Sequence, residues 1–124
     1  MLIRDILEES EKKFSEIKAV KWLKKKEICD RSYRELMENV KSVRKGLCEE
    51  SFQGKHIALI GSSSVEWIEA YLGIITGQAV AVPLDAGLPA EDLIDLLNRS
   101  DAEALFLSPK IQTLSERILD ECPK

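Results

Sequence analysis

The stretch HIALIGSSSVEWIEAYLGIITGQAVAVPL, residues 56–84, determines the fold class that this sequence predicts. Residues 56–60 are a continuous apolar run of strand length, residues 65–77 carry apolar side chains at helical spacing, and residues 79–84 form a second apolar run. Strands that are apolar on both faces and alternate with helices indicate a parallel sheet covered on each side.

The same alternation continues beyond this stretch. Residues 89–100 predict a helix with Pro89 in its first turn, residues 102–107 predict a third strand, and residues 110–122 predict a final helix. The fold class is therefore α/β: a three-stranded parallel sheet flanked by helices in the order β-α-β-α-β-α. Within the helix at 65–77 we expect five apolar residues to face the core: Val65, Ile68, Tyr71, Leu72 and Ile75.

The residues before this unit predict a different pattern. We expect an amphipathic helix over residues 2–18, followed by a β-hairpin whose two strands flank Lys24, Lys25 and Lys26. Ser32 then opens a helix, because Ser32 and Glu35 have the spacing of a capping box. The single domain of 124 residues thus divides into a helix-hairpin-helix lead-in, residues 1–53, and an α/β unit, residues 54–124.

Composition excludes several classes of function. Hydrophobic residues make up 44% of the chain and charged residues 32%, which is the balance of a globular protein. The net charge of −4 gives no reason to expect nucleic acid, and we interpret the three consecutive lysines as a solvated hairpin tip. The N-terminus lacks the apolar core of a signal peptide, and no apolar run approaches the ~20 residues of a transmembrane segment. The sequence therefore predicts a cytoplasmic protein.

The cysteines and the histidine predict no catalytic or metal site. Cys29, Cys48 and Cys122 are an odd number at wide spacing, which fits neither a disulfide framework nor paired zinc ligands. We expect reduced, partly buried thiols. His56 is the only histidine, and nothing in the sequence places an acid against it for nucleophilic catalysis.

The loop Gly61-Ser62-Ser63-Ser64 joins a strand to a helix, which is a setting in which many proteins hold a phosphate. A phosphate-binding loop needs further glycines or a lysine with a following hydroxyl, and this loop has neither. Glu66 would also place a negative charge in the first helical turn. Ser63 and Glu66 have the spacing of a second capping box, so we interpret the loop as a helix cap.

Three stretches resemble the opening of the adenylate-forming superfamily, which includes acyl-CoA synthetases, non-ribosomal peptide adenylation domains and luciferases: residues 31–36, 56–85 and 93–110. The first is similar to the family's Thr/Ser-Tyr-x-Glu-Leu motif, here Ser32, Tyr33, Glu35 and Leu36. The second is similar to its small-residue-Gly-x-x-x-x-Pro-Leu/Ile-Asp/Asn motif, here Thr76, Gly77, Pro83, Leu84 and Asp85. Family members usually carry an asparagine in the loop where this chain has serines.

The resemblance implies the N-terminal portion of an AMP-forming carboxylate–CoA ligase several times longer than this chain. We expect the carboxylic acid substrate to be a fatty acid, and the full-length enzyme to use ATP, Mg²⁺ and coenzyme A. The family's phosphate-binding loop, ribose-binding acid and catalytic lysine have no counterpart in these residues. The chain is therefore expected to be an incomplete N-terminal subdomain without catalytic, cofactor-binding or metal-binding residues, inactive by itself, whose partner is the remainder of the parent polypeptide.

Other functions remain open. A non-ribosomal peptide-type adenylation domain is the nearest alternative within the family. A stand-alone flavodoxin-like module would place a ligand at the carboxyl ends of the strands, near Gly61, Leu84-Asp85 and Ser108. An interaction fragment would self-associate through an exposed sheet edge. For Glu66, Trp67 and Asp85, the remaining candidates for a site, we expect structural roles.

Overall fold

The computed structural model describes residues 2–107 of the chain. The helix predicted at 110–122 therefore lies outside the described residues, as do Ser108 and Cys122.

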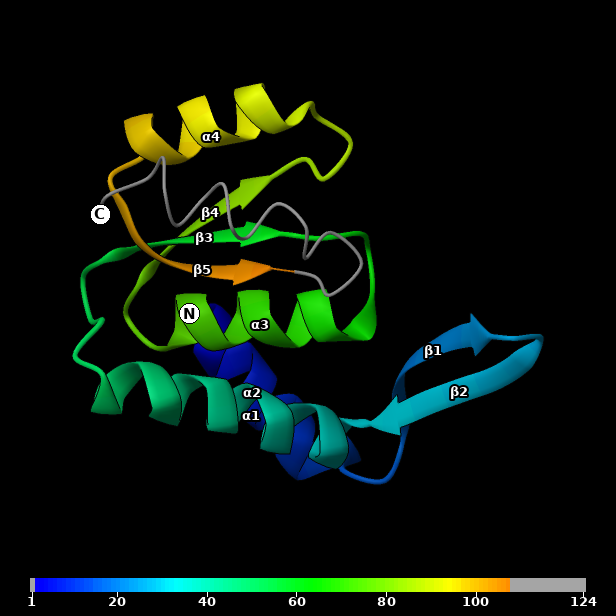
Figure 1. The fold of residues 1–124 in the computed structure, drawn as a ribbon. Coiled ribbons are helices and arrows are strands. Elements are labelled where there is room, and N and C mark those ends of the chain that lie inside the picture. The colour runs from blue at the N-terminus through cyan, green and yellow to red at the C-terminus, as the bar shows by residue number, and fades with distance from the viewer. Residues whose placement is uncertain (1, 108–124) are drawn as a thin grey trace.

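Nine elements follow one another along the described residues (Figure 1). They are α1 (Ile3–Phe14), β1 (Lys18–Lys24), β2 (Glu27–Ser32), α2 (Tyr33–Glu49), β3 (His56–Ile60), α3 (Val65–Thr76), β4 (Val80–Leu84), α4 (Ala90–Arg99) and β5 (Ala102–Leu107). The predicted α/β class, with a hairpin and two helices before three parallel strands, is confirmed.

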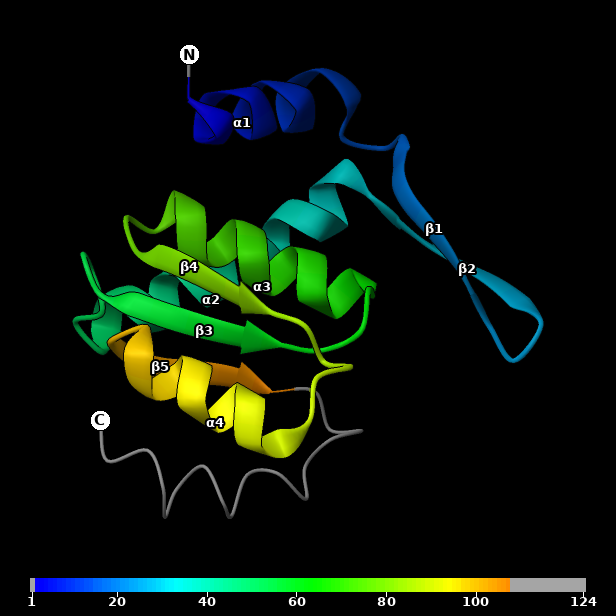
Figure 2. The ribbon, with the colours of Figure 1, turned by 90° about the horizontal axis from the view of Figure 1, so that it is seen from above.

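The parallel sheet has the strand order β4-β3-β5, so the first of the three strands lies in the middle. Successive side chains of a strand point to opposite faces. Ile57 of β3 packs with Leu47 of α2 and Ile74 of α3, whereas Ala58 and Ile60 pack against α4. The helices α3 and α4 therefore cover opposite faces of the sheet, as the view from above shows (Figure 2).

Helix α3 lies between the sheet and α2, and this position corrects the predicted inward face. Its buried residues are Val65, Glu69, Ala70, Gly73, Ile74 and Thr76. Of the five residues predicted to face the core, only Val65 is buried, and the other four are half-buried. The reason is that small residues occupy the closest contacts of a helix packed on two sides: a Cβ atom on Gly73 would lie only 2.5 Å from the Cβ of Val43 in α2.

Local capping explains where the helices begin. The Ser32 hydroxyl accepts from the Glu35 amide at 3.1 Å, and the Glu35 carboxylate accepts from the Ser32 amide at 3.0 Å, which confirms that capping box. Helix α1 ends at Phe14 and not near residue 18, because the amide of Ile17 turns back to the Phe14 carbonyl at 2.9 Å. Pro89 is the residue before α4, not a member of its first turn.

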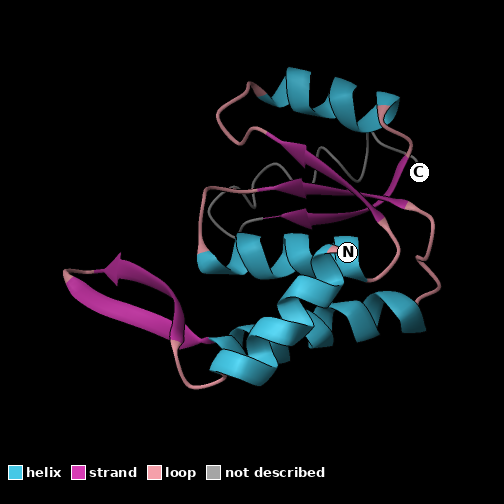
Figure 3. Ribbon diagram, turned by 180° about the vertical axis from the view of Figure 1, so that it is seen from behind, coloured by secondary structure: helices cyan, strands magenta, loops and turns pink. Residues whose placement is uncertain are grey.

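The hairpin β1–β2 projects from the rest of the molecule (Figures 1 and 3). Its strands are antiparallel, as predicted, and Lys25 and Lys26 form the turn with φ values of 50° and 69°. Left-handed backbone at both turn residues matches the twist of the strands, although asparagine and glycine adopt it at lower cost. Val20 and Trp22 anchor the base of the hairpin against the buried face of α2.

Candidate functional site

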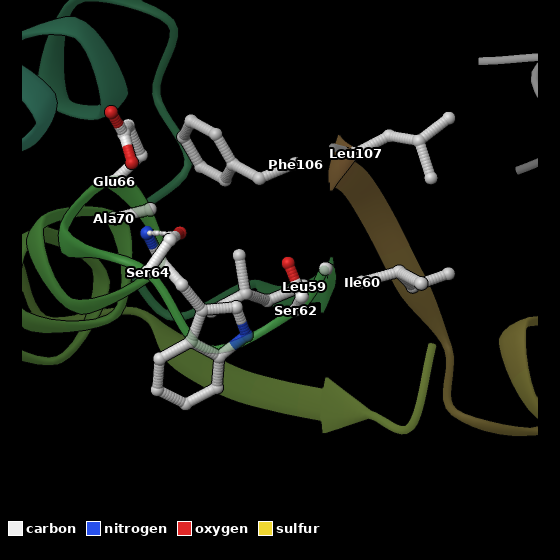
Figure 4. Close-up of a pocket in the computed structure, with 10 residues that line it drawn as sticks. Leu59, Ile60, Ser62, Ser64, Glu66, Ala70, Phe106 and Leu107 are labelled. Carbon is white, nitrogen blue, oxygen red and sulfur yellow. Dashed lines mark hydrogen bonds between the residues drawn. The ribbon is translucent and has the colours of Figure 1, made fainter. Parts of the chain in front are cut away.

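A cavity of about 450 Å³ lies at the carboxyl ends of β3 and β5, beside the first turns of α3 (Figure 4). Its lining residues are Leu59, Ile60, Gly61, Ser62, Ser64, Glu66, Trp67, Ala70, Phe106 and Leu107. The cavity includes the Gly-Ser-Ser-Ser loop that sequence reasoning singled out. It is therefore the candidate site of the described residues.

The walls of the cavity are apolar because of the strand register. Leu59 of β3 pairs with Phe106 of β5, which places these two side chains next to one another on the face that α3 covers. Trp67 and Ala70 approach from α3, and the Trp67 ring stacks on Tyr71 at 5.3 Å between centroids with 10° between the ring planes. The space therefore suits an uncharged, apolar group.

The serine loop begins α3, but through a different serine from the one predicted. Ser64 is the N-cap, and its Oγ accepts from the Trp67 amide at 3.1 Å (Figure 4). The interpretation of the loop as a cap is thus confirmed, whereas the Ser63–Glu66 capping box is wrong. With Ser64 at the cap, the residue three positions later is Trp67, which cannot return a bond to the cap amide. Ser62 and Ser63 are exposed.

The charges around the cavity do not fit a polyphosphate. Among the described lining residues, Glu66 is the charged one, and no lysine or arginine is present. A triphosphate bound here would meet a carboxylate in place of the cations and bound metal that such ligands require. The described residues therefore do not fit ATP at this loop, and we derive no chemical step from it.

The other residues considered from the sequence have local bonding partners. The Asp85 carboxylate follows β4 at the same sheet edge as Gly61, where its Oδ1 accepts from the Gly87 amide at 2.8 Å. His56 Nδ1 donates to the Ser100 carbonyl at 2.7 Å. Neither side chain lines the cavity. Asp85 lies beside Gly61, because Ile60 pairs with Leu84, whereas His56 lies at the other end of β3.

The second family-like motif contributes to packing. The Thr76 hydroxyl donates to the Leu72 carbonyl at 2.6 Å and accepts from Arg44 Nε of α2 at 3.2 Å. A Cβ atom on Gly77 would lie 2.9 Å from the Gly73 carbonyl oxygen, which explains the glycine at the end of α3. Gln78, the next residue, has the left-handed φ of 65°.

Sequence reasoning missed a buried carboxylate. Glu69 of α3 is 6% exposed, and its Oε2 accepts from Asn39 Nδ2 at 2.6 Å. Arg31 Nε lies 3.4 Å from the same oxygen, close enough for an ion pair, although its N–H is not aimed for a hydrogen bond. Burial raises the pKa of Glu69 above 4.5, and the contacts with Asn39 and Arg31 oppose that rise. The cluster links the hairpin to both α2 and α3.

Sequence reasoning also missed three apolar residues of the cavity: Leu59, Phe106 and Leu107. They became neighbours only through the pairing of β3 with β5. The small residues at 70, 73 and 77 mark a helix edge that packs closely against a neighbour, but they do not show that Glu69 beside them is buried.

The thiols and acidic residues form no metal site within residues 2–107. Cys29 and Cys48 are free there, the first half-buried and the second exposed. No group of three or more histidine, cysteine, aspartate or glutamate residues in the described part could hold a metal ion. None of the described helices is both long and apolar enough to cross a membrane.

Comparison with known proteins shows a match to one protein family and relatives that are similar to part of this chain. The profile of the family described as AMP-binding enzyme matches residues 7–124. A CoA ligase of Gibberella moniliformis (strain M3125 / FGSC 7600) is 37% identical over 76 residues, which are 61% of this chain and 13% of that protein. The nonribosomal peptide synthetase criC of Aspergillus cristatus is 33% identical over 78 residues, 63% of this chain and 4% of that protein. The chain thus spans a small part of these relatives' length.

A solved structure shares the fold. The anthranilate CoA ligase AuaEII, in complex with anthranoyl-AMP, superposes with a TM-score of 0.82 at 22% identity. The superposition covers 96% of this chain and 22% of that chain. The arrangement of hairpin, helices and three-stranded sheet therefore matches the fold of one part of that longer chain.

Proposed function

Since this chain belongs to the AMP-binding enzyme family of adenylate-forming ligases, we propose that it forms the N-terminal part of an AMP-forming carboxylate–CoA ligase. Such a ligase joins a carboxylic acid to the α-phosphate of ATP, which gives an acyl-adenylate and pyrophosphate. The thiol of coenzyme A then takes the acyl group and releases AMP. The family match over residues 7–124, together with the CoA ligase relative, carries this proposal.

In this proposal the described residues act as scaffold. The cavity beside the serine loop has no cation that could meet a phosphate, and the two family-like motifs are used for a helix cap and for helix packing. The groups that hold ATP, Mg²⁺ and coenzyme A would come from the remainder of the parent polypeptide, which is the partner we propose. Mg²⁺ would supply charge neutralisation on the polyphosphate there. We propose no catalytic, cofactor-binding or metal-binding residue in this chain, and no nucleic-acid partner.

We further propose that the acid is a fatty acid and that the enzyme is cytoplasmic. The opening helix followed by the strand at Ala19–Trp22 resembles fatty acyl-CoA synthetases more than other branches of the family. We also propose that the chain divides into a helix-hairpin-helix lead-in, residues 1–53, and an α/β unit, residues 54–124.

A peptide-synthetase adenylation domain is the second candidate, because the synthetase criC matches a segment of similar length. It would use an amino acid as substrate and a carrier-protein thiol as acceptor. For either candidate we also propose self-association through β4, which is an edge strand of the sheet within residues 2–107 and whose Val80 is 46% exposed.

The test is acid-dependent ATP–pyrophosphate exchange. The 124-residue chain is assayed beside a version extended along its reading frame to the length of the relatives, each with a long-chain fatty acid and with a mixture of amino acids. We expect no exchange by the chain alone and exchange by the extended enzyme with the fatty acid. Exchange by the chain alone would refute the scaffold role, and exchange with amino acids only would favour the peptide-synthetase candidate.

A further inference from the structure

The end of the hairpin β1–β2 exposes an apolar pair. Leu23 and Ile28 are directly opposite one another in the antiparallel register. They are 74% and 72% exposed, more than the other large hydrophobic residues in the described part of the chain. Among the described residues most of the Leu23 and Ile28 surface is uncovered, so this apolar surface can make a further contact.

The two faces of the hairpin have different environments. Val20 and Trp22 belong to the face that packs toward α2, and the Trp22 ring lies 5.6 Å beneath the Arg31 guanidinium. Leu23 and Ile28 belong to the opposite face, because side chains alternate along a strand. The hairpin itself projects away from the helices (Figures 1 and 3).

The same tip is basic within an acidic chain. Residues 18–31 contain six lysine and arginine residues and two acidic ones, whereas the chain as a whole has a net charge of −4. Lys24, Lys25 and Lys26 follow Leu23 directly, around the turn. One of the two acids, Asp30, already pairs with Lys18 at 3.2 Å. Positive charge therefore dominates the hairpin end.

We propose that the hairpin tip docks on an anionic lipid surface. Leu23 and Ile28 enter the boundary between headgroups and acyl chains, while the turn lysines lie at the level of the lipid phosphates. Lysine suits this position, because its methylene stem packs on apolar surface while its ammonium group stays among the headgroups.

The shape of the tip favours a lipid surface over a protein partner. The apolar pair lies on a narrow two-stranded ribbon that ends in a two-residue turn. A convex, basic tip with two aliphatic side chains can enter a fluid surface without a matching cavity. An acidic protein is the competing partner, and the experiment separates the two.

The experiment is flotation of the 124-residue chain with vesicles. One set contains phosphatidylglycerol and phosphatidylcholine, and the control set contains phosphatidylcholine alone. We expect the chain to float with the anionic vesicles only, and added salt to weaken the binding because screening reduces the lysine contribution. Polyglutamate serves as the acidic polypeptide probe.

Two variants designed to keep the hairpin fold separate the contribution of the lysine charges to vesicle binding from that of the apolar pair. Lys25→Asn with Lys26→Gly removes two charges while supplying the residues that the left-handed turn prefers, and should lower partitioning about 30-fold. Leu23→Thr with Ile28→Thr keeps strand propensity while removing the apolar pair, and should lower partitioning at least about tenfold. Circular dichroism and thermal unfolding confirm that each variant is folded.

The matched control removes two exposed lysines elsewhere, at the end of α1: Lys12→Gln with Lys13→Gln. Its partitioning should change less than about threefold. The proposal is overturned if the chain ignores anionic vesicles, if the threonine variant binds as well as wild type, or if the α1 control loses as much binding as the turn variant. Binding to polyglutamate without binding to vesicles would assign the tip to a protein. Concentration-dependent dimers that the threonine variant abolishes, without lipid binding, would assign it to a second copy of the chain.

Discussion

Replacing Gly73 with alanine tests the close contact between α3 and α2. Gly73 of α3 faces Val43 of α2, and a Cβ atom built on Gly73 lies 2.5 Å from the Val43 Cβ. Ordinary contacts of this kind begin at 3.4 Å, so the two helices must separate by close to 0.9 Å to admit one methyl group. A gap of that size removes a quarter to a half of the dispersion energy across the contact.

The expected magnitude follows from two opposing terms. Overpacking costs about 1–3 kcal/mol, and alanine in place of glycine within a helix returns up to about 1 kcal/mol. Gly73→Ala should therefore lower the free energy of unfolding by about 1–2 kcal/mol. Denaturation by urea, followed by circular dichroism, measures the change through the transition midpoint.

Gly46 provides a matched control. It is the fourth residue from the end of α2, as Gly73 is the fourth from the end of α3, and a Cβ atom on Gly46 meets nothing within 4 Å. Gly46→Ala should therefore leave stability unchanged or raise it by up to about 1 kcal/mol. A Gly73→Ala protein as stable as the Gly46→Ala protein would show that the close α2–α3 contact does not exist.

The double-mutant cycle sharpens the test. Val43→Ala should rescue Gly73→Ala only in part, because the Cβ atom of residue 43 remains in alanine. Val43→Gly removes that atom, so the Gly73→Ala and Val43→Gly pair should show a favourable coupling of more than about 1 kcal/mol. Additive effects of the two substitutions would contradict the geometry.

Three further substitutions test the caps and the buried carboxylate. Ser64→Ala should lower the free energy of unfolding by about 1 kcal/mol, because it removes the N-cap of α3. Ser63→Ala should change it by less than half as much, and equal effects of the two substitutions would contradict the assignment of Ser64 as the cap. Because the pKa of Glu69 is higher in the folded than in the unfolded state, the protonated side chain stabilises the fold at low pH. This stabilisation is complete below the unfolded-state pKa and is lost as the pH rises through the folded-state pKa. Glu69→Gln should therefore gain stability relative to wild type as the pH rises from about 4.5 toward neutrality, which urea midpoints at several pH values measure; a pH-independent difference would contradict the raised pKa. Hydrogen bonds with Ser32 lower the pKa of Glu35, so the ionised Glu35 carboxylate stabilises the fold. The greater stability of wild type over Glu35→Gln should therefore disappear as the pH falls below the ordinary carboxylate range.

Local signals explain why much of the fold could be predicted. The strands at 56–60 and 102–107 have the bounds that their apolar patterns indicated, and the helix predicted at 65–77 ends one residue earlier, at Thr76. The Ser32–Glu35 capping box is equally local, because it joins groups three residues apart. The error at the α3 cap came from the same kind of signal: three consecutive serines offer alternative caps, and the spacing to Glu66 favoured the wrong one.

The candidate site could be predicted only in part. The sequence located the serine loop but gave no sign of the cavity beside it, since Phe106 is more than 40 residues from Ser64 and reaches it only when β5 pairs with β3. The family relationship was visible in the motifs at residues 31–36 and 76–85, which serve as a cap and as helix packing.

The sequence by itself determined the α/β class and the bounds of most elements, because hydrophobic period, helix caps and turns act between residues close along the chain. Only the tertiary structure decided three features: the order β4-β3-β5, the apolar cavity beside α3, and the burial of Glu69 beside Asn39 and Arg31. Each depends on which surfaces meet when distant segments pack. A helix covered on two sides buries small and charged residues that its own hydrophobic pattern would place in water.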